Sequence, residues 1–152
     1  MPKEIQNFLA EATEKAKANL IKAVESLPDD RRYWSPLDKG RSAVDQAAEC
    51  AMLNGSTADI IASRAWPTDY SMEQFFQDKS ALATSWEKTK ALLEETTPKA
   101  MAAILSVADE DLKVSVDMPW GAMTLSEIMA YPLWNMSYHE GQTYYIQFLG
   151  DE

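Results

Sequence analysis

Apolar residues recur every three or four positions through the first 26 residues, and lysines and glutamates stand between them. These apolar residues are Ile5, Phe8, Leu9, Ala12, Ala16, Leu20 and Val24. The spacing places their side chains on one face of a helix, so the chain from Lys3 to Ser26 is predicted to form an amphipathic helix. The helix ends at the following run with Pro28, Asp29 and Asp30, because proline and aspartate disfavour a helix interior.

A second helix is predicted after a linker over residues 31–40. Ser42 is a typical N-cap residue, and Asp45 lies in the first turn, where a negative charge is favourable. The alanine- and methionine-rich segment that follows predicts a helix to about Arg64. Asn54-Gly55 lies inside it and is also a good turn signal, so a turn is the alternative at that point.

The middle of the chain predicts a third helix and little else. A connecting stretch that contains Phe75 and Phe76 leads to a helix over residues 80–107, which Pro98 should kink or split in two. Residues 113–117 alternate polar and apolar side chains over too short a length for a sheet. At most, they form a short hairpin with residues 120–123.

The last helix begins at Thr124-Leu125-Ser126-Glu127, which has the pattern of a capping box. It is predicted to run to Leu149, to bend at Pro132 and to stop at Gly150. Five glycines and seven prolines are too few for a turn-dense β-sandwich. Four long helices and no strong strand therefore predict an all-α four-helix bundle that forms one domain over residues 1–152.

The charge of the chain excludes several classes of partner. Acidic residues number 24 and basic residues 14, which gives a net charge of −10. Such a protein repels phosphate backbones and anionic lipids, so we expect no nucleic-acid and no membrane partner. The start of the chain has no apolar signal segment, and the longest apolar runs fall far short of the ~20 residues that span a bilayer. We expect a soluble cytoplasmic protein.

The chain has one cysteine and one histidine. Cys50 alone allows neither an internal disulfide nor a cysteine-based zinc cluster, and we interpret it as a small buried apolar residue, with a reactive thiol as the alternative. His139 alone excludes a site built from two of the chain's own histidines. There is no Walker loop, no Gly-x-Gly-x-x-Gly and no nucleophile elbow.

Three polar residues interrupt the apolar line of the last helix. The line reads Leu125, Ile128, Pro132, Asn135, His139, Gln142, Ile146 and Leu149. Burial of a polar side chain is costly unless it finds partners, so this face should meet a polar pocket, a ligand or water. Asn135 and His139 are one turn apart and can converge on one point. A histidine satisfied within the core is the alternative.

A possible partner stands in the second helix. Glu49 is the only charged residue in the run from Ala47 to Leu53, which makes it a candidate ligand or acid–base group. It also lies near Asp45 on the helix surface, so it could instead belong to a solvated face.

These residues resemble those of the DinB/YfiT-like superfamily. The segment from Asn135 to Gln142, followed by Tyr144-Tyr145-Ile146 and Leu149-Gly150, is similar to the last helix of that family. The family pattern there is a histidine, three residues, a second histidine, one residue and Gly-Gln. Trp34-Ser35-Pro36, with Lys39-Gly40-Arg41-Ser42 opening a helix, is similar to the family's entry into the second helix. The resemblance covers nearly the whole chain in helix order.

The resemblance implies a four-helix bundle, often a homodimer, with a divalent metal held by one histidine of the second helix and two of the last. By position, His139 matches the third of these histidines, Asn135 stands at the second and Glu49 at the first, seven residues after Ser42. The implied metal site is therefore Glu49, Asn135 and His139, and the metal zinc, nickel or manganese. Carboxylate and imidazole are good ligands for these ions, whereas a neutral amide oxygen is a poor one.

Two classes of function remain at this stage. The first is a DinB-like enzyme, a divalent-metal-dependent thiol S-transferase or hydrolase, with a low-molecular-weight thiol or another small molecule as its partner. The second is a non-catalytic binding or stress-response bundle that has lost the metal. In both, Glu49, Asn135 and His139 are expected to converge between the second and last helices. A homodimer is expected from the family resemblance and from the aromatic and methionine content.

Overall fold

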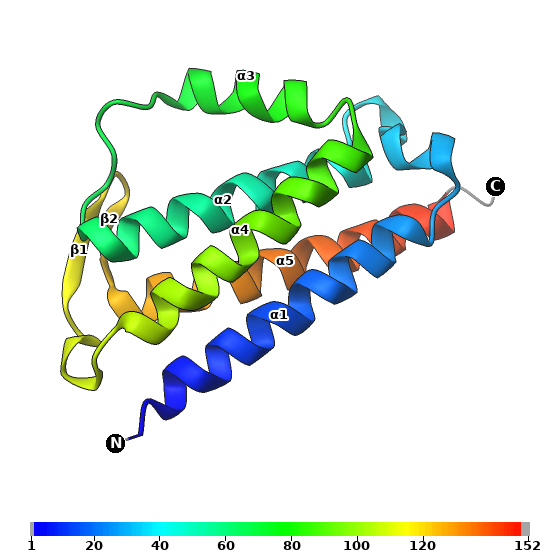
Figure 1. Cartoon of the computed structure of the whole chain (residues 1–152). Helices are drawn as coiled ribbons and strands as arrows, with labels where there is room; N and C mark the ends of the chain where they lie inside the picture. The colour runs from blue at the N-terminus through cyan, green and yellow to red at the C-terminus, as the bar shows by residue number, and fades with distance from the viewer. Residues whose placement is uncertain (1, 150–152) are drawn as a thin grey trace.

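Four long helices pack along their lengths in the structure, a computed structural model that describes residues 2–149 (Figure 1). They are α1 (Glu4–Glu25), α2 (Ala43–Ser63), α4 (Trp86–Ser106) and α5 (Leu125–Leu149). The expectation of an all-α four-helix bundle is confirmed. No helix within the described part of the chain combines the length and the apolar content needed to cross a bilayer.

The four long helices do not alternate in direction along the chain. In Figure 1, α1 and α5 run the same way, and α2 and α4 run the opposite way. The neighbouring pairs are α1 with α5, α5 with α2, α2 with α4, and α4 with α1. Long connections make this order possible. Two 3-10 turns, η1 (Asp29–Tyr33) and η2 (Pro36–Asp38), join α1 to α2, and α3 (Met72–Leu82) lies between α2 and α4.

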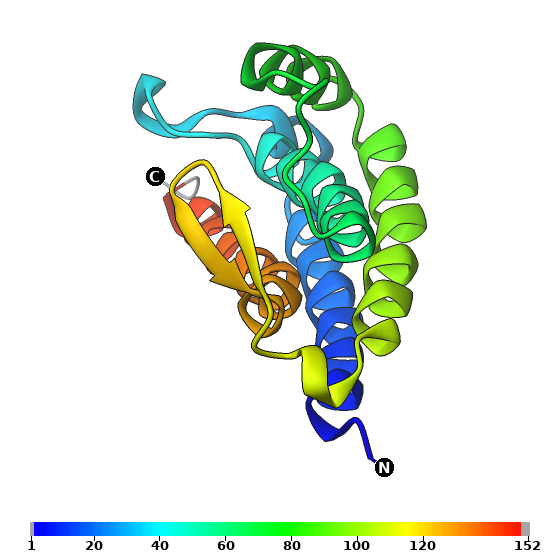
Figure 2. The same ribbon diagram turned by 90° about the vertical axis from the view of Figure 1, so that its left-hand side faces the viewer.

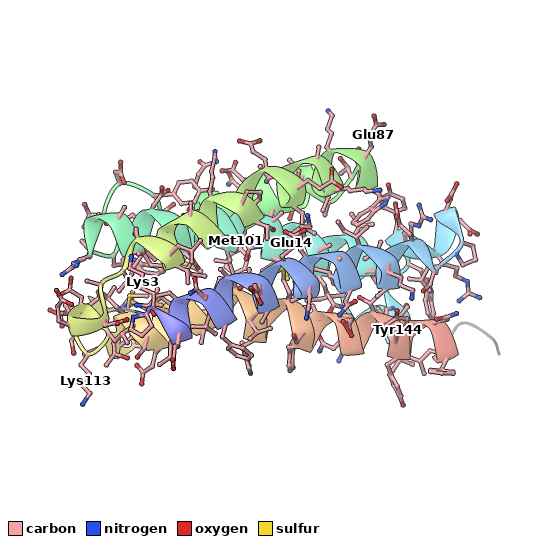
Figure 3. All side chains as sticks on the ribbon, turned by 60° about the horizontal axis from the view of Figure 1, so that its bottom comes forward. Lys3, Glu14, Glu87, Met101, Lys113 and Tyr144 are labelled. Carbon is pink, nitrogen blue, oxygen red and sulfur yellow. The ribbon has the colours of Figure 1, made fainter. Side chains whose placement is uncertain are left out.

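The inward face of α1 is shifted from the one that its apolar pattern predicts. Ile5 and Phe8 are 48% and 66% exposed, which corrects their expected place in the inner line. Gln6 takes an inward position instead, and its Nε2 donates to the carbonyl oxygen of Val107 (2.9 Å) and to Oδ1 of Asp109 (2.8 Å). These two bonds hold the start of α1 to the end of α4. Exposed charges such as Glu87 and Lys113 point away from the bundle (Figure 3).

The Asn54-Gly55 pair lies inside an uninterrupted α2, and packing against α4 explains why no turn forms there. The Nδ2 of Asn54 donates to Oγ1 of Thr97 at 3.1 Å, so the amide is satisfied within the bundle. A Cβ at Gly55 would lie 3.3 Å from Cγ2 of Thr96, so glycine allows a close approach of the two helices. Tertiary contacts therefore override the local turn preference.

The segment before the third long helix differs from the prediction. The stretch with Phe75 and Phe76 is not a simple connection but the helix α3, capped by Ser71, whose Oγ accepts from the N–H of Gln74. The long helix α4 accordingly begins at Trp86 rather than at about Ser80, and it is not split at its proline. Only Phe75 and Lys79 of α3 are buried, which left little apolar periodicity to detect.

A two-stranded hairpin leads into α5, as the sequence allowed. Strands β1 (Ser115–Met118) and β2 (Gly121–Thr124) pair antiparallel and lie beside the start of α5 (Figure 2). The capping box is confirmed in both directions. The N–H of Thr124 donates to Oε2 of Glu127 (2.9 Å), and the N–H of Glu127 donates to Oγ1 of Thr124 (3.2 Å). The helix continues through Pro132, and its predicted stop at Gly150 lies outside the described residues.

Candidate functional site

The neighbouring helices α2 and α5 bring Glu49 and His139 into direct contact. Nε2 of His139 lies 2.6 Å from Oε2 of Glu49. His139 is 4% exposed, and the Glu49 side chain is 20% exposed. The sequence expectation that these two residues converge between the second and last helices is therefore confirmed.

The other ring nitrogen of His139 also faces oxygen atoms. Nδ1 lies 2.7 Å from Oε1 of Gln46 and 2.8 Å from Oε1 of Gln142. The amide of Gln46 is oriented by a second bond, because its Nε2 donates to the carbonyl oxygen of Arg41 (3.2 Å). Nδ1 must therefore carry a hydrogen and donate it.

The protonation of the pair follows from Glu49. Burial acts to raise the pKa of this carboxyl, but the hydrogen bond from His139 and the nearby Arg41 charge outweigh burial and lower it. Glu49 is therefore a carboxylate, and Nε2 of His139 must donate to it. His139 and Glu49 therefore form a short hydrogen-bonded pair between the two helices.

Arg41 closes the cluster on its other side. Its Nη1 lies 3.1 Å from Oε1 of Glu49, and its Nε lies 2.5 Å from Oδ2 of Asp45. Lys79 of α3 reaches the second oxygen of Asp45 at 3.5 Å. Burial opposes the charge of Arg41, but its two carboxylate partners raise its pKa, so the guanidinium stays charged. Sequence reasoning missed Arg41, although its spacing of four from Asp45 was a usable signal.

Asn135 does not join the pair. It is buried one turn before His139, and its Nδ2 lies 3.6 Å from Sγ of Cys50, with no contact to Glu49 or His139 among the hydrogen bonds of residues 2–149. Cys50 is fully buried, and burial together with the charge of Glu49 raises the pKa of its thiol. The thiol is therefore protonated and inaccessible, as expected for a buried apolar residue.

A divalent metal does not fit the side chains as they are arranged. A zinc ligand must present a free lone pair at about 2.0–2.2 Å from the ion, but Nε2 of His139 directs its hydrogen at Glu49. Arg41 lies on the other oxygen of Glu49, so a positive charge already neutralises the carboxylate that the ion would need. Within residues 2–149, no three histidine, cysteine, aspartate or glutamate side chains form a group able to hold a metal ion.

An apolar pocket of about 380 Å³ adjoins Glu49. Its walls come from α2, the α2–α3 connection, α3, the hairpin and the start of α5, with Phe75, Met123 and Ile128 among the lining residues. A more open hollow of about 750 Å³ continues from it along the α2–α3 connection and contains none of Glu49, Asn135 and His139. Sequence reasoning missed the pocket because its walls are five separate segments, none of which has a motif.

These features define a class: a four-helix bundle with parallel first and last helices, and a carboxylate–imidazole pair between the second helix and the last. Among solved structures, the chain is similar to YfiT from Bacillus subtilis, described as a probable metal-dependent hydrolase with an unusual four-helix bundle topology. The TM-score is 0.76 at 18% sequence identity, and the match covers 99% of this chain and 90% of the other. This likeness confirms a YfiT-like four-helix-bundle fold. No family model and no curated protein matches the sequence.

Proposed function

We propose that this chain is a DinB-like bundle that binds a small molecule in the pocket beside Glu49 and His139, without a resident metal ion. The contact of 2.6 Å between Nε2 of His139 and Oε2 of Glu49 carries the proposal. Two of the three groups that the family resemblance assigns to metal binding, Glu49 and His139, satisfy each other here. The pocket of about 380 Å³ next to them lies within the usual size range of ligand sites.

A metal-dependent hydrolase is the second candidate. It is favoured by the description of YfiT and by the presence of two good ligand types, the Glu49 carboxylate and the His139 imidazole, in one place. It requires that His139 release its Nε2 proton and that Glu49 move away from Arg41. The amide of Asn135 would also have to turn from Cys50 to supply a third ligand.

A thiol S-transferase has less support than a hydrolase. Glutathione and bacillithiol carry carboxylates at neutral pH, and Glu49 is the only charged residue among the described side chains that line the pocket. Two like charges at close range repel, most strongly where water is scarce. The pocket therefore disfavours such thiols.

The metal content of protein purified without a polyhistidine tag separates the two candidates. We expect well under one equivalent of metal and no increase in melting temperature with Zn²⁺, Ni²⁺ or Mn²⁺. One retained equivalent that is lost in His139→Ala and Glu49→Gln would instead refute the metal-free proposal and favour the metal-dependent candidate. Glu140→Gln is the control, because it changes a glutamate that follows His139 directly and makes no contact with Glu49 in the described structure.

A further inference from the structure

The pocket beside Glu49 has a lining that limits what it can bind. Three methionines, two tryptophans and two phenylalanines are among its lining residues: Met72, Met118, Met123, Trp66, Trp120, Phe75 and Phe76. Thioether and aromatic side chains favour flat apolar molecules, and methionine adapts to their shape. A volume of about 380 Å³ is at the small end of the range for ligand sites.

Two indole rings meet across parts of the chain that are distant in sequence. Trp66 follows α2, Trp120 lies at the turn of the hairpin, and their ring centroids are 5.4 Å apart at an interplanar angle of 77°. Nε1 of Trp120 lies 3.3 Å from Sδ of Met123, which holds the indole beside the pocket. Trp120 is nevertheless 66% exposed, so it lies where the pocket opens to solvent.

The polar end of the pocket has unused hydrogen-bonding capacity. A carboxylate offers about four acceptor positions, and Glu49 uses one on each oxygen, for Arg41 and for His139. Tyr131 also lines the pocket, and its hydroxyl has no hydrogen-bond partner within the described residues. Burial, together with the charge of Glu49, raises the pKa of this hydroxyl, which keeps it protonated and able to donate.

From this lining we infer that the pocket takes a small, uncharged aromatic molecule with one hydroxyl group, which donates to Glu49 and accepts from Tyr131. The inference rests on the proposed function and specifies its ligand. An anionic group in place of the hydroxyl would meet Glu49, the one charged residue among the described side chains that line the pocket, and could not donate a hydrogen bond to it. A molecule without a donor would leave the acceptor positions of Glu49 unpaired in a largely apolar site.

Three naphthalenes that differ only in the group at position 2 test the inference. They are 2-naphthol, 2-methoxynaphthalene and 2-naphthoate, each titrated calorimetrically into the full chain. A hydrogen bond to a charged acceptor contributes about tenfold or more in affinity, so 2-naphthol should bind at least about tenfold more tightly than 2-methoxynaphthalene. No binding of 2-naphthoate is expected. Tyr131→Phe, which removes one hydroxyl, should reduce the preference for 2-naphthol without changing the far-ultraviolet circular dichroism.

A pair of methionine variants locates the binding. Met123→Glu places a second carboxylate in the pocket and should abolish binding of 2-naphthol. Met101→Glu is its control, because Met101 is also a half-buried methionine of the same core but does not line the pocket.

Equal binding of 2-naphthol and 2-methoxynaphthalene, both blocked by Met123→Glu, would overturn the ligand class and leave the proposed binding site standing. Binding that Met123→Glu leaves intact, or no binding of any probe, would overturn this inference, whereas the metal analysis decides the proposed function independently.

Discussion

Replacement of Glu49 by leucine should destabilise the protein far more than the loss of one surface charge. In Glu49→Leu, the Nε2–H of His139 loses its acceptor inside the bundle, and Arg41 loses one of its two carboxylates. Removal of one partner from a buried ion pair costs about 3–5 kcal/mol. The Glu49 side chain is 20% exposed, which admits some water, so we expect the lower end, about 3 kcal/mol.

The measurement is urea unfolding followed by circular dichroism at pH 7, with thermal unfolding as a check. For a chain of this length, a loss of about 3 kcal/mol lowers the melting temperature by about 6–12 °C. The control is Glu95→Leu, since Glu95 is a 60% exposed helical glutamate in an i,i+4 pair with Lys99, and it should cost less than about 1 kcal/mol.

A double variant decides whether the pair is the cause. Glu49→Leu combined with His139→Leu removes both partners of the contact, and replacement of a buried pair by apolar residues is often neutral. The double variant should therefore be more stable than Glu49→Leu by about 1 kcal/mol or more. If the two single losses simply add, or if Glu49→Leu costs no more than Glu95→Leu, the reasoning from the pair is wrong.

The same pair should make stability depend on pH. The pKa of Glu49 in the folded protein lies below its ordinary value of 4.5. A carboxyl whose pKa is lowered on folding contributes stability above its unfolded pKa and loses it as the pH falls through the folded pKa. The difference in unfolding free energy between the wild type and Glu49→Gln should therefore shrink below about pH 4.5. A difference that stays constant from pH 7 to pH 3 would contradict the assignment.

Three further outcomes are expected. Cys50 should not react with a thiol reagent in the native protein and should react once urea unfolds it, because it is fully buried; rapid reaction of the folded protein would contradict this. Gly55→Ile should destabilise the protein by about 1–3 kcal/mol, since even a Cβ there would lie 3.3 Å from Thr96, and an unchanged urea midpoint would refute that packing. We also propose a homodimer through the outer face of α5, where Trp134, Tyr145 and Phe148 are 57%, 64% and 71% exposed. Sedimentation should give twice the chain mass of 17.1 kDa, with Tyr145→Glu shifted toward the monomer, whereas a wild-type monomer at all micromolar concentrations would refute the dimer.

Much of the fold could be predicted because its helix starts have local signals. Ser42 and Thr124 are capping residues whose hydrogen bonds depend only on the next three residues, so sequence alone places them. The helix α3 has the same kind of cap at Ser71, but it buries so little that no apolar stripe accompanies the signal. Capping hydrogen bonds can therefore be predicted from the sequence. The formation of a helix over residues 72–82 also depended on contacts with α2, which the sequence does not show.

The site was predictable in part for a related reason. Glu49 and His139 each stood out against an apolar background, and polar side chains on facing helices must find each other. The partner of Asn135 could not be predicted, because the conformation of its side chain against α2 places the amide beside Cys50, and one helix pattern does not reveal that conformation. The pocket could not be predicted either, since its walls depend on how the hairpin and the α2–α3 connection fold over α2.

The parallel course of α1 and α5 has a consequence for how fast the protein folds. Simple bundles fold quickly because each helix packs against the next one along the chain. Here the closing contacts join distant positions: Ser26 meets Gln147 across 121 residues, and Glu49 meets His139 across 90. Long loops must close before these contacts form, which costs chain entropy and slows folding. We therefore expect refolding at the slower rates of mixed α/β domains, even though nearly all of the secondary structure is helical.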